Sequence, residues 1–344
     1  MPTIAVVMAT FNGEAWLNDQ LASIAQQTRL PDRLVISDDG STDNTVELAK
    51  DFARGAPFEV VLLEGPHAGI AENFWYAARH AHTSVIAWCD QDDVWFPQKL
   101  ELCESLMETN NVPYVTHSAL VTDAALVPRD QLFPRYRKTR VVQALAGDPW
   151  WCAPGFTTLF RAELLQLARW DDRPVLQMGS RLGHDNVIAL LAFATGPRLE
   201  ISDVMANYRQ HESNKAGAPK KIGVLEKSRF ALALPSTAHS DRAEIASVYA
   251  EFIAMCDPLN TEAIDYFSVL QARSLRRAKI QQSPGRLSGA CNLLVALAQG
   301  DFGRKSRGRF GVRALARDLM ALGLGAHRYR RSSQKRVSPG SPSD

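Results

Sequence analysis

The chain has 344 residues, of which 46% are hydrophobic and 22% are charged, and its formal net charge is +2. This balance is ordinary for a globular protein and gives no reason to expect a nucleic-acid partner. No apolar run approaches the roughly 20 residues that span a bilayer, and the start lacks the layout of a signal peptide, so we expect a cytoplasmic protein. The five scattered cysteines form no CxxC pair, which argues against a zinc site or a disulfide framework.

Strands and helices alternate through the first part of the chain. Residues 4–9 form a short apolar run typical of a buried strand, and apolar residues recur at helical spacing over 17–25. A second strand at 33–37 completes a βαβ unit, which implies parallel strands. The pattern continues with a helix at 46–52, a strand at 59–63, a helix at 69–78 and a strand at 84–89. The sequence therefore predicts an α/β fold.

Three carboxylates, Asp90, Asp92 and Asp93, follow the strand at 84–89. In an extended chain residues i and i+2 point to the same side, so Asp90 and Asp92 can face one ligand. Clustered carboxylates raise one another's pKa unless a cation neutralises them, and their hard oxygens suit Mg²⁺ or Mn²⁺. The alternative is a solvated acidic turn. The flanking residue Trp88 favours a ligand site at the carboxyl edge of an α/β sheet.

A second acidic pair, Asp38 and Asp39, stands at the end of the strand at 33–37. A turn that leads into a helix explains Gly40 and Asp43, which follow this pair. It does not explain two adjacent carboxylates at the end of a strand.

These segments together resemble a known family. Residues 8–12, 37–43, 73 and 90–93 occur in the order and spacing of the family-2 inverting glycosyltransferases. The resemblance covers about the first 215 residues. It implies a GT-A fold, in which helices flank a Rossmann-like sheet that binds a nucleotide sugar. Residues 90–95 resemble bacterial members that build surface polysaccharides, including rhamnosyltransferases.

The resemblance also implies roles for the residues at the strand ends. Phe11 would lie against the nucleobase, and Asp39 would accept the ring N–H of uracil or thymine. A carboxylate suits this task because an unpaired buried polar group costs about 1–3 kcal/mol. Asp90 would face the ribose and the sugar, and Asp92 would bind the metal on the diphosphate. The implied donor-binding set is Thr10, Phe11, Asn12, Asp38, Asp39, Asn73, Asp90 and Arg209.

His184 and Asp185 precede an apolar helix. Asp185 could simply be a charge that complements the helix dipole. In similar enzymes the aspartate at this position is the catalytic base. Aromatic residues often follow that aspartate, whereas this chain has Asn186 and Val187, a difference that concerns the acceptor more than the chemistry.

The run Tyr208-Arg209-Gln210-His211 resembles an element of the same subgroup that continues to Asn214. A lone histidine is usually structural. With Arg209 nearby, His211 would add a second ligand or donor for the diphosphate. The resemblance thus implies a Mn²⁺ or Mg²⁺ site made by Asp92, Asp90 and His211.

The chain changes character beyond residue 215. We expect a GT-A domain at 1–215, a helical and basic region at 216–331, and a disordered tail at 332–344. Apolar spacing indicates helices within 243–255 and 263–278, and no further strand is expected. Earlier, 128–139 is expected to be a polar connection. The aromatic pair at 150–151 suits either sugar stacking or core packing, and we assign no role to residues 150–155.

Basic residues gather in three runs of this region and form either solvated surface or a patch for anionic lipid. They are Arg273, Arg276, Arg277 and Lys279; Arg304, Lys305, Arg307 and Arg309; and Arg328, Arg330, Arg331, Lys335 and Arg336.

The function expected from this sequence is that of a metal-dependent inverting glycosyltransferase. The donor would be a UDP- or dTDP-sugar, with dTDP-rhamnose a candidate. The acceptor would be a hydroxyl of a growing lipopolysaccharide, capsule or exopolysaccharide, free or lipid-linked. The enzyme would work in the cytoplasm or at the inner face of the plasma membrane. The alternative is a non-catalytic carbohydrate-binding or assembly subunit with the same fold. A glycoside hydrolase fits the strand-end carboxylates less well, and a dehydrogenase would need a G-x-G-x-x-G after the first strand.

Overall fold

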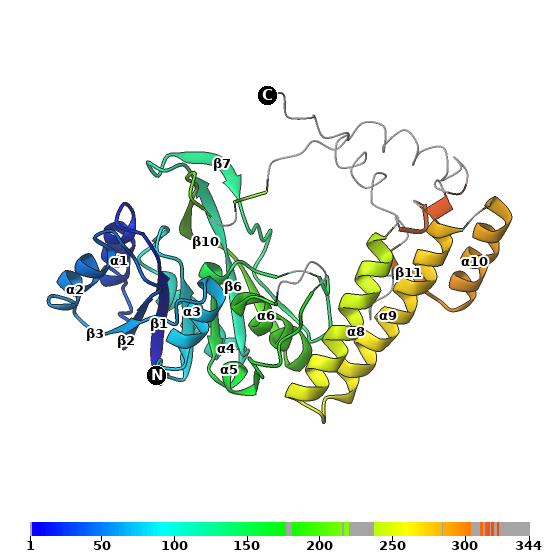
Figure 1. The fold of residues 1–344 in the computed structure, drawn as a ribbon, viewed down its shortest axis with the longest axis horizontal. Coiled ribbons are helices and arrows are strands. Elements are labelled where there is room, and N and C mark those ends of the chain that lie inside the picture. Colours follow the sequence, from blue (N-terminus) through cyan, green and yellow to red (C-terminus); the bar gives the residue numbers. More distant parts are fainter. Residues whose placement is uncertain are drawn as a thin grey trace, which may run out of the picture. The chain divides into compact units, whose positions relative to one another are not determined.

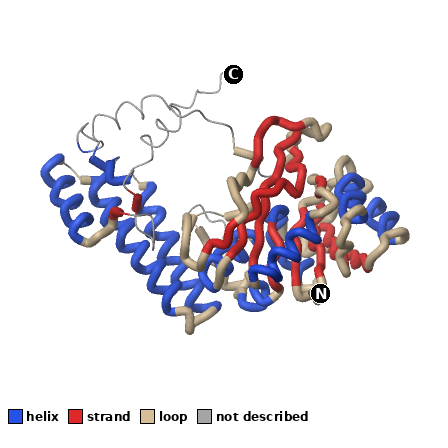
Figure 2. Tube along the Cα trace, turned by 180° about the vertical axis from the view of Figure 1, so that it is seen from behind, coloured by secondary structure: helices blue, strands red, loops and turns tan. Residues whose placement is uncertain are grey.

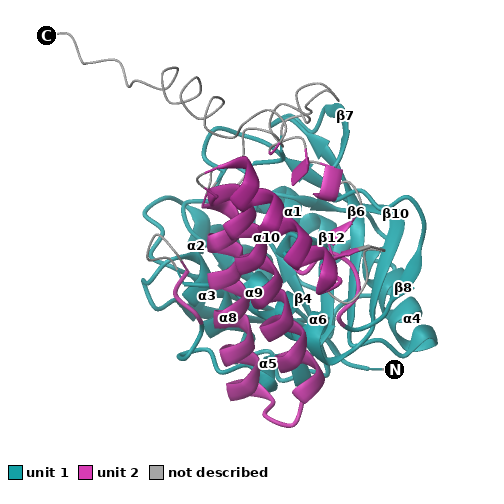
Figure 3. Ribbon diagram, turned by 90° about the vertical axis from the view of Figure 1, so that its right-hand side faces the viewer, with its two compact units in different colours: residues 1–144, 150–173, 181–220 teal, residues 145–149, 174–180, 221–344 magenta. Residues whose placement is uncertain are grey.

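A computed structural model of the chain describes residues 2–150, 152–176, 181–214, 217–219, 237–283, 285–303, 310–311, 314–316, 318–319 and 322. The chain divides into two compact units (Figure 3). Unit 1 comprises Met1–Ala144, Trp150–Arg173 and Arg181–Lys220. Unit 2 comprises Leu145–Pro149, Pro174–Ser180 and Lys221–Asp344.

Unit 1 is built on a sheet whose strands run in the order β3-β2-β1-β4-β9-β6-β10-β5, with β7 beside β6 and β8 beside β10. The neighbours β3, β2, β1 and β4 are parallel, as the alternation of strands and helices predicts (Figure 1). The strands are β1 (Ile4–Thr10), β2 (Arg33–Asp38), β3 (Glu59–Glu64), β4 (Val85–Cys89), β5 (Val94–Trp95), β6 (Tyr114–Thr122), β7 (Pro128–Leu132), β8 (Arg140–Val142), β9 (Thr158–Arg161) and β10 (Arg198–Arg209).

Helices cover both faces of this sheet. Alternate residues of β1, namely Ile4, Val6 and Met8, point into a core shared with α1, α2 and α4. Helix α3 contacts β1, β2 and α6 instead, and it supplies none of the residues of that core. The helices are α1 (Leu17–Ala25), α2 (Thr45–Ala53), α3 (Ile70–Ala78), α4 (Lys99–Asn110), α5 (Glu163–Leu167) and α6 (His184–Thr195), with a 3₁₀ turn η1 (Gly155–Thr157).

Two parts of unit 1 differ from the sequence-based expectation. The segment 128–139, expected to be a connection, contains β7, which pairs antiparallel with β6. The twelve-residue strand β10 pairs parallel with β6, antiparallel with β5 and antiparallel with β8. Both strands depend on partners that are distant in sequence, which a local pattern does not reveal.

Unit 2 is helical in the region after residue 237. It contains α8 (Ala238–Cys256), α9 (Thr261–Gln282) and α10 (Arg286–Ala298). Figure 2 shows these helices in blue. The first two confirm the helices expected within 243–255 and 263–278, and α10 lies in the region 216–331 that was expected to be helical. The expectation of no further strand is wrong, because the short strands β11 (Phe302–Gly303) and β12 (Phe310–Gly311) pair with each other.

None of the helices in the described ranges combines the length and the apolarity that a bilayer-spanning segment needs. The basic runs at 304–309 and 328–336, the tail at 332–344 and Trp151 lie outside the described residues.

Candidate active site

The carboxyl ends of three neighbouring strands bring the predicted donor residues to one edge of the sheet. β1 pairs in parallel with both β2 and β4, so that Thr10 lies opposite Asp38 and Met8 lies opposite Cys89. Asp90 follows Cys89 directly. The segments that follow β1, β2 and β4 therefore meet at this edge, which is where α/β sheets usually bind ligands.

The two adjacent aspartates at the end of β2 have different environments. The carboxylate of Asp38 accepts four hydrogen bonds, from the backbone N–H of Gly40 and Ser41, from Ser41 Oγ and from Thr10 Oγ1. Asp39 Oδ2 accepts one hydrogen bond, 2.8 Å from the backbone nitrogen of Gly69. Asp39 Oδ1 is buried and has no partner among the described residues. Asp38 is thus occupied in holding its own loop, while Asp39 keeps one acceptor for a ligand.

The ring of Phe11 is exposed to solvent, and two hydrogen bonds with Gln91 hold the backbone of Phe11 in place. The side chain is 52% exposed. The amide of Gln91 accepts from Phe11 N at 3.0 Å and donates to Phe11 O at 3.1 Å. A Cβ atom on Gly13 would collide with the same amide. Sequence reasoning missed Gln91, because it stands between two more conspicuous aspartates.

Asn12 and Asn73 support the strand ends. Asn12 Oδ1 accepts from the backbone nitrogen of Thr42 at 2.8 Å, which joins the loop after β1 to the loop after β2. Asn73 is buried, and its Nδ2 donates to the carbonyl of Ser37 at 2.7 Å. These bonds fix the positions of Phe11 and Asp39, the two residues predicted to hold the base.

The carboxyl groups of Asp90 and Asp93 after β4 are buried beside other acidic groups, which favours their protonated, uncharged forms. Burial, and then the charges of Asp92 and Asp185, raise the pKa of Asp90 to about 8. The effect of Asp185 on this pKa shows that the predicted base lies within electrostatic reach of Asp90. Lys99 is fully buried nearby, and its ammonium donates to the carbonyl of Phe156 at 2.6 Å. Burial lowers the pKa of Lys99 to about 7, so this side chain is only partly protonated near neutral pH and offsets the acidic groups only in part.

Asp92 and His211 are brought together as the sequence predicts. His211 Nε2 donates to Asp92 Oδ2 at 2.9 Å, and Asn214 Nδ2 donates to the same oxygen at 3.2 Å. The ring of His211 stacks on Trp16 with the centroids 4.8 Å apart. Asp92 Oδ1 has no protein partner in the part of the chain that the structure describes.

The described residues contain no group of three or more His, Cys, Asp or Glu side chains arranged to hold a metal ion. The predicted ligand set of Asp90, Asp92 and His211 therefore stays a prediction. A site with one or two carboxylates is nonetheless normal for Mg²⁺, because substrate phosphates and water complete its coordination. The oxygen donors after β4 fit a hard divalent cation, and a bound cation would favour the ionised form of the crowded carboxyl groups.

The guanidinium of Arg209 has protein partners. It donates to Asp19 Oδ2 at 2.7 Å and lies 4.8 Å from the centroid of the Trp16 ring. Its backbone N–H donates to the buried Asp93 Oδ1. Sequence reasoning missed Trp16 and Asp19, since no spacing connects them with a residue 190 positions away. Contact between Arg209 and a diphosphate stays a prediction.

Asp185 lies in the first turn of α6, which follows Gly183. Its Oδ1 accepts from the backbone nitrogen of Asn186 at 2.8 Å. The preceding His184 is buried, stacks on Phe74 with the centroids 4.0 Å apart, and has a pKa lowered by that burial. Burial and a lowered pKa make His184 a weak base, and the role of Asp185 as the base stays a prediction.

Gly155 allows this close packing. A Cβ atom at that position would lie 3.3 Å from His184 Nε2 and 3.5 Å from Asp185 Cβ. The segment 150–155, to which the sequence assigned no role, thus contributes at least one residue beside the predicted base.

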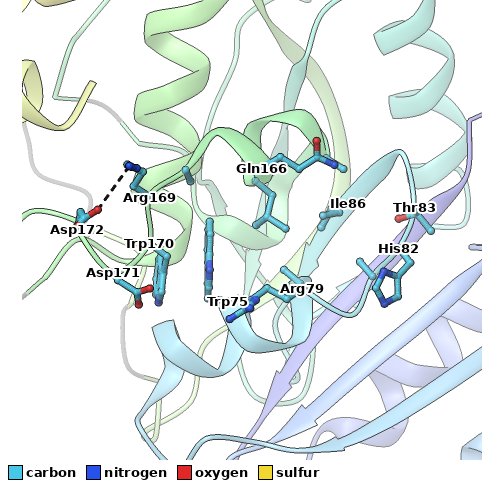
Figure 4. Close-up of a pocket in the computed structure, with 15 residues that line it drawn as sticks. Trp75, Arg79, His82, Thr83, Ile86, Gln166, Arg169, Trp170, Asp171 and Asp172 are labelled. Atoms are coloured by element: carbon cyan, nitrogen blue, oxygen red, sulfur yellow. Dashed lines mark ion pairs between the residues drawn. The ribbon is translucent and has the colours of Figure 1, made fainter. Parts of the chain in front are cut away.

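A separate cavity of about 580 Å³ lies at the opposite, amino end of β4, where His82, Thr83 and Ile86 line it (Figure 4). Trp75 also lines it and stacks on Trp170 with the centroids 4.3 Å apart. None of the predicted site residues borders this cavity.

Comparisons with known proteins show which proteins this chain is similar to. Residues 5–166 match the family described as Glycosyl transferase family 2. The dTDP-rhamnosyl transferase RfbG of Shigella flexneri is 33% identical over 109 residues, which are 30% of this chain and 38% of that protein. The UDP-Glc:alpha-D-GlcNAc-diphosphoundecaprenol beta-1,3-glucosyltransferase WfgD of Escherichia coli is 30% identical over 113 residues, which are 33% of this chain and 44% of that protein.

Among solved structures, residues 1–349 of S. aureus TarS in complex with UDP-GlcNAc have a TM-score of 0.56 at 16% identity. That comparison covers 96% of this chain and 92% of the other, and it shows a shared fold. The curated relatives are matched over less than two thirds of their own length. The family match and the order of the strand-end motifs agree, and residues 5–166 form a domain of glycosyltransferase family 2.

Proposed function

We propose that this protein is a metal-dependent inverting glycosyltransferase. It moves a sugar from a UDP- or dTDP-sugar to a hydroxyl of a growing bacterial surface glycan. The observation that carries the proposal is the unpaired, buried Oδ1 of Asp39 beside the exposed ring of Phe11, at the sheet edge that also holds Asp90 and Asp92.

The donor base is a pyrimidine. Asp39 Oδ1 accepts the ring N–H of uracil or thymine, and Phe11 stacks on the base. Two relatives support this choice, because their names specify dTDP-rhamnosyl and UDP-Glc donors. The solved TarS structure with UDP-GlcNAc is a third protein of this fold that binds a uridine nucleotide. A dTDP-rhamnose donor is the finer proposal, supported by the RfbG likeness.

Asp92 and Asp90 hold Mn²⁺ or Mg²⁺ against the donor diphosphate. The bound cation supplies charge neutralisation for the departing nucleoside diphosphate. His211 and Asn214 orient the Asp92 carboxylate through their hydrogen bonds to its Oδ2, so that its Oδ1 is available to the metal. Asp90, once deprotonated, faces the ribose and the sugar. Arg209 contributes to the diphosphate site if its bond to Asp19 opens.

Asp185 takes the proton from the acceptor hydroxyl as that oxygen attacks the anomeric carbon. The hydroxyl approaches from the face opposite to the departing diphosphate, so a single displacement inverts the anomeric configuration. The charge of Asp185 acts on Asp90, which supports a base close to the sugar.

The acceptor is a lipid-linked glycan at the inner face of the plasma membrane. The likeness to WfgD supports a lipid diphosphate acceptor, because that protein's name specifies one. The basic runs at 304–309 and 328–336 support attraction to anionic lipid, whereas Arg273, Arg276 and Arg277 of the first run are engaged in ion pairs with Asp301 and Asp318.

An assay with a panel of nucleotide sugars tests this function. We expect UDP- or dTDP-sugars to be hydrolysed slowly, and transferred faster when a glycan acceptor is supplied. The product should have the inverted anomeric configuration by NMR, and chelation of divalent metal should stop turnover. Tight nucleotide-sugar binding without turnover of any donor would instead identify a non-catalytic carbohydrate-binding or assembly subunit.

A further inference from the structure

Helix α10 exposes an apolar face to solvent. Leu287 is 86% exposed and Leu294 is 65% exposed, and Cys291 and Val295 are exposed as well. The buried side of α10 is smaller, with Leu293 packed against α9. A surface helix normally shows polar residues on the side that faces water.

The exposed residues of α10 form one continuous stripe. At about 100° per residue, Leu287, Cys291, Leu294 and Ala298 fall on one line along the helix, with Val295 beside it. This set is called the α10 stripe below. Contiguous exposed apolar surface of this kind usually marks a site of interaction.

The charge around the α10 stripe is positive. The sequence from residue 266 to 300 contains no Asp or Glu. Lys279 and Arg286 are exposed near the start of α10. The two acidic residues that follow are neutralised, because Arg276 pairs with the buried Asp301 at 2.7 Å. The second, buried Asp318, pairs with Arg277, also at 2.7 Å.

This combination fits an anionic lipid bilayer better than a protein. A second copy docked through the same face would offer Lys279 and Arg286 no acidic partner, because in a symmetric interface both copies present residues 266–300, which contain no Asp or Glu. The chain's own segment 323–344 is a poor cover, since it contains five Lys and Arg residues and few apolar ones. Apolar side chains with flanking cations and no free acid are typical of helices that lie in the membrane interface.

We propose that the α10 stripe inserts into the boundary between headgroups and acyl chains of an anionic bilayer. This inference rests on the proposed function, because it names the surface through which the enzyme meets the membrane that carries its acceptor. Insertion contributes apolar burial to membrane binding, and this contribution is separate from the electrostatic attraction between the basic runs and anionic headgroups. Salt weakens the attraction between charges but leaves apolar burial in place.

A fluorescent label on Cys291 reports insertion directly. Cys89 and Cys103 are buried, so a full-length Cys152→Ser, Cys256→Ser variant leaves Cys291 as the accessible thiol. With an environment-sensitive fluorophore there, we expect a blue shift on adding vesicles of phosphatidylglycerol and phosphatidylcholine. The shift should be much smaller with phosphatidylcholine alone. A shift without vesicles that depends on protein concentration would instead show a second copy on this face. Emission that is already blue-shifted without vesicles, at every protein concentration, would show that the chain itself covers the α10 stripe. Either would overturn the proposal.

A matched pair of charge substitutions provides the second test. Leu294→Glu places a charge in the stripe, and Val127→Glu places the same charge on an exposed apolar position of unit 1. We expect Leu294→Glu to lower the vesicle partition coefficient roughly tenfold or more, because one inserted leucine contributes a factor of this size. Val127→Glu should have little effect. Equal effects of the two variants, or no vesicle binding by the unaltered chain, would contradict insertion.

Nucleotide binding separates this inference from the proposed function. Leu294→Glu should bind UDP in solution as the unaltered chain does, because the α10 stripe belongs to unit 2 and the site residues belong to unit 1. If the chain fails to bind any nucleotide but its α10 stripe inserts, the proposed function falls and the membrane contact stands. If UDP binds and the α10 stripe does not insert, the membrane contact falls and the proposed function stands.

Discussion

The carboxylates of the candidate site differ in how many hydrogen bonds the protein already supplies to them. Among the described residues, Asp38 accepts three bonds from its own loop and one from Thr10, whereas Asp39 has one partner and Asp92 has two on a single oxygen. A saturated carboxylate has little capacity left for a ligand, so Asp38 supports the site while Asp39 and Asp92 can bind. The resemblance alone placed Asp38 and Asp39 in the same donor-binding set.

The sequence identified the aspartates but not the side chains that hold them. Gln91 clamps the backbone of Phe11, and Trp16 stacks on His211. Neither belongs to a pattern that predicts such a contact, because the partner of each lies about 80 residues or more away in the sequence and is brought close only by the sheet. Strand-end carboxylates are easier to find, since parallel strands align their carboxyl ends whatever the details of packing.

Asp185→Asn tests the proposed base. The substitution removes the proton acceptor while keeping the shape of the side chain, so turnover should fall by roughly 10²–10⁴-fold. Donor affinity should barely change. If Asp185 serves only as a helix charge, the rate should remain and stability should fall by about 0.3–1 kcal/mol. Turnover, donor affinity and melting temperature of the one variant distinguish the two outcomes, and a near-normal rate would leave the base unassigned.

At the scale of elements, the βαβ units of the first hundred residues were predictable because each strand and helix carries its own apolar period. Strands β7 and β10 were not, since their pairing with β6 is decided by distant neighbours. Helix α10 lies in the region expected to be helical, but its bounds were not predicted, for a different reason. Apolar residues occupy both its buried and its exposed sides, so its sequence lacks the one-sided pattern of a surface helix.

The close approach of the ends of β2 and β3 makes Gly65 sensitive to substitution. A Cβ atom there would lie 2.7 Å from the backbone oxygen of Asp38 and 2.6 Å from Asn73 Oδ1. We expect Gly65→Ala to destabilise the protein by about 1–3 kcal/mol, because the strand ends must move apart. UDP affinity should fall too, since Asp39 follows the displaced carbonyl.

Gly55→Ala is the matched control for this prediction. A Cβ atom at Gly55 would meet nothing within 4 Å, so we expect a change within about 0.5 kcal/mol. Thermal unfolding and UDP titration of both variants provide the comparison. Similar stability and affinity for the two variants would show that the strand ends are not packed as described.

At the scale of the whole molecule, the family match covers residues 5–166, which lie almost entirely within unit 1. The strand-end motifs that carry the resemblance all belong to that unit. Unit 2 includes the short segments Leu145–Pro149 and Pro174–Ser180 besides the C-terminal helices. The sequence placed the end of the GT-A domain at residue 215 and offered no signal for such interleaving. The proposed membrane contact belongs to unit 2 and the proposed chemistry to unit 1.

The most direct test of the central claim is a calorimetric titration of the full chain with UDP, dTDP, GDP and ADP in the presence of Mn²⁺. UDP and dTDP should bind at least about tenfold more tightly than the purine nucleotides, a difference of about 1.4 kcal/mol, because a purine overfills a pyrimidine-sized slot and adenine also lacks the ring N–H that Asp39 accepts. Their affinity should drop when Mn²⁺ is withheld. Equal affinities for the four nucleotides, or no binding at all, would contradict a pyrimidine nucleotide-sugar site at the carboxyl edge of β1, β2 and β4.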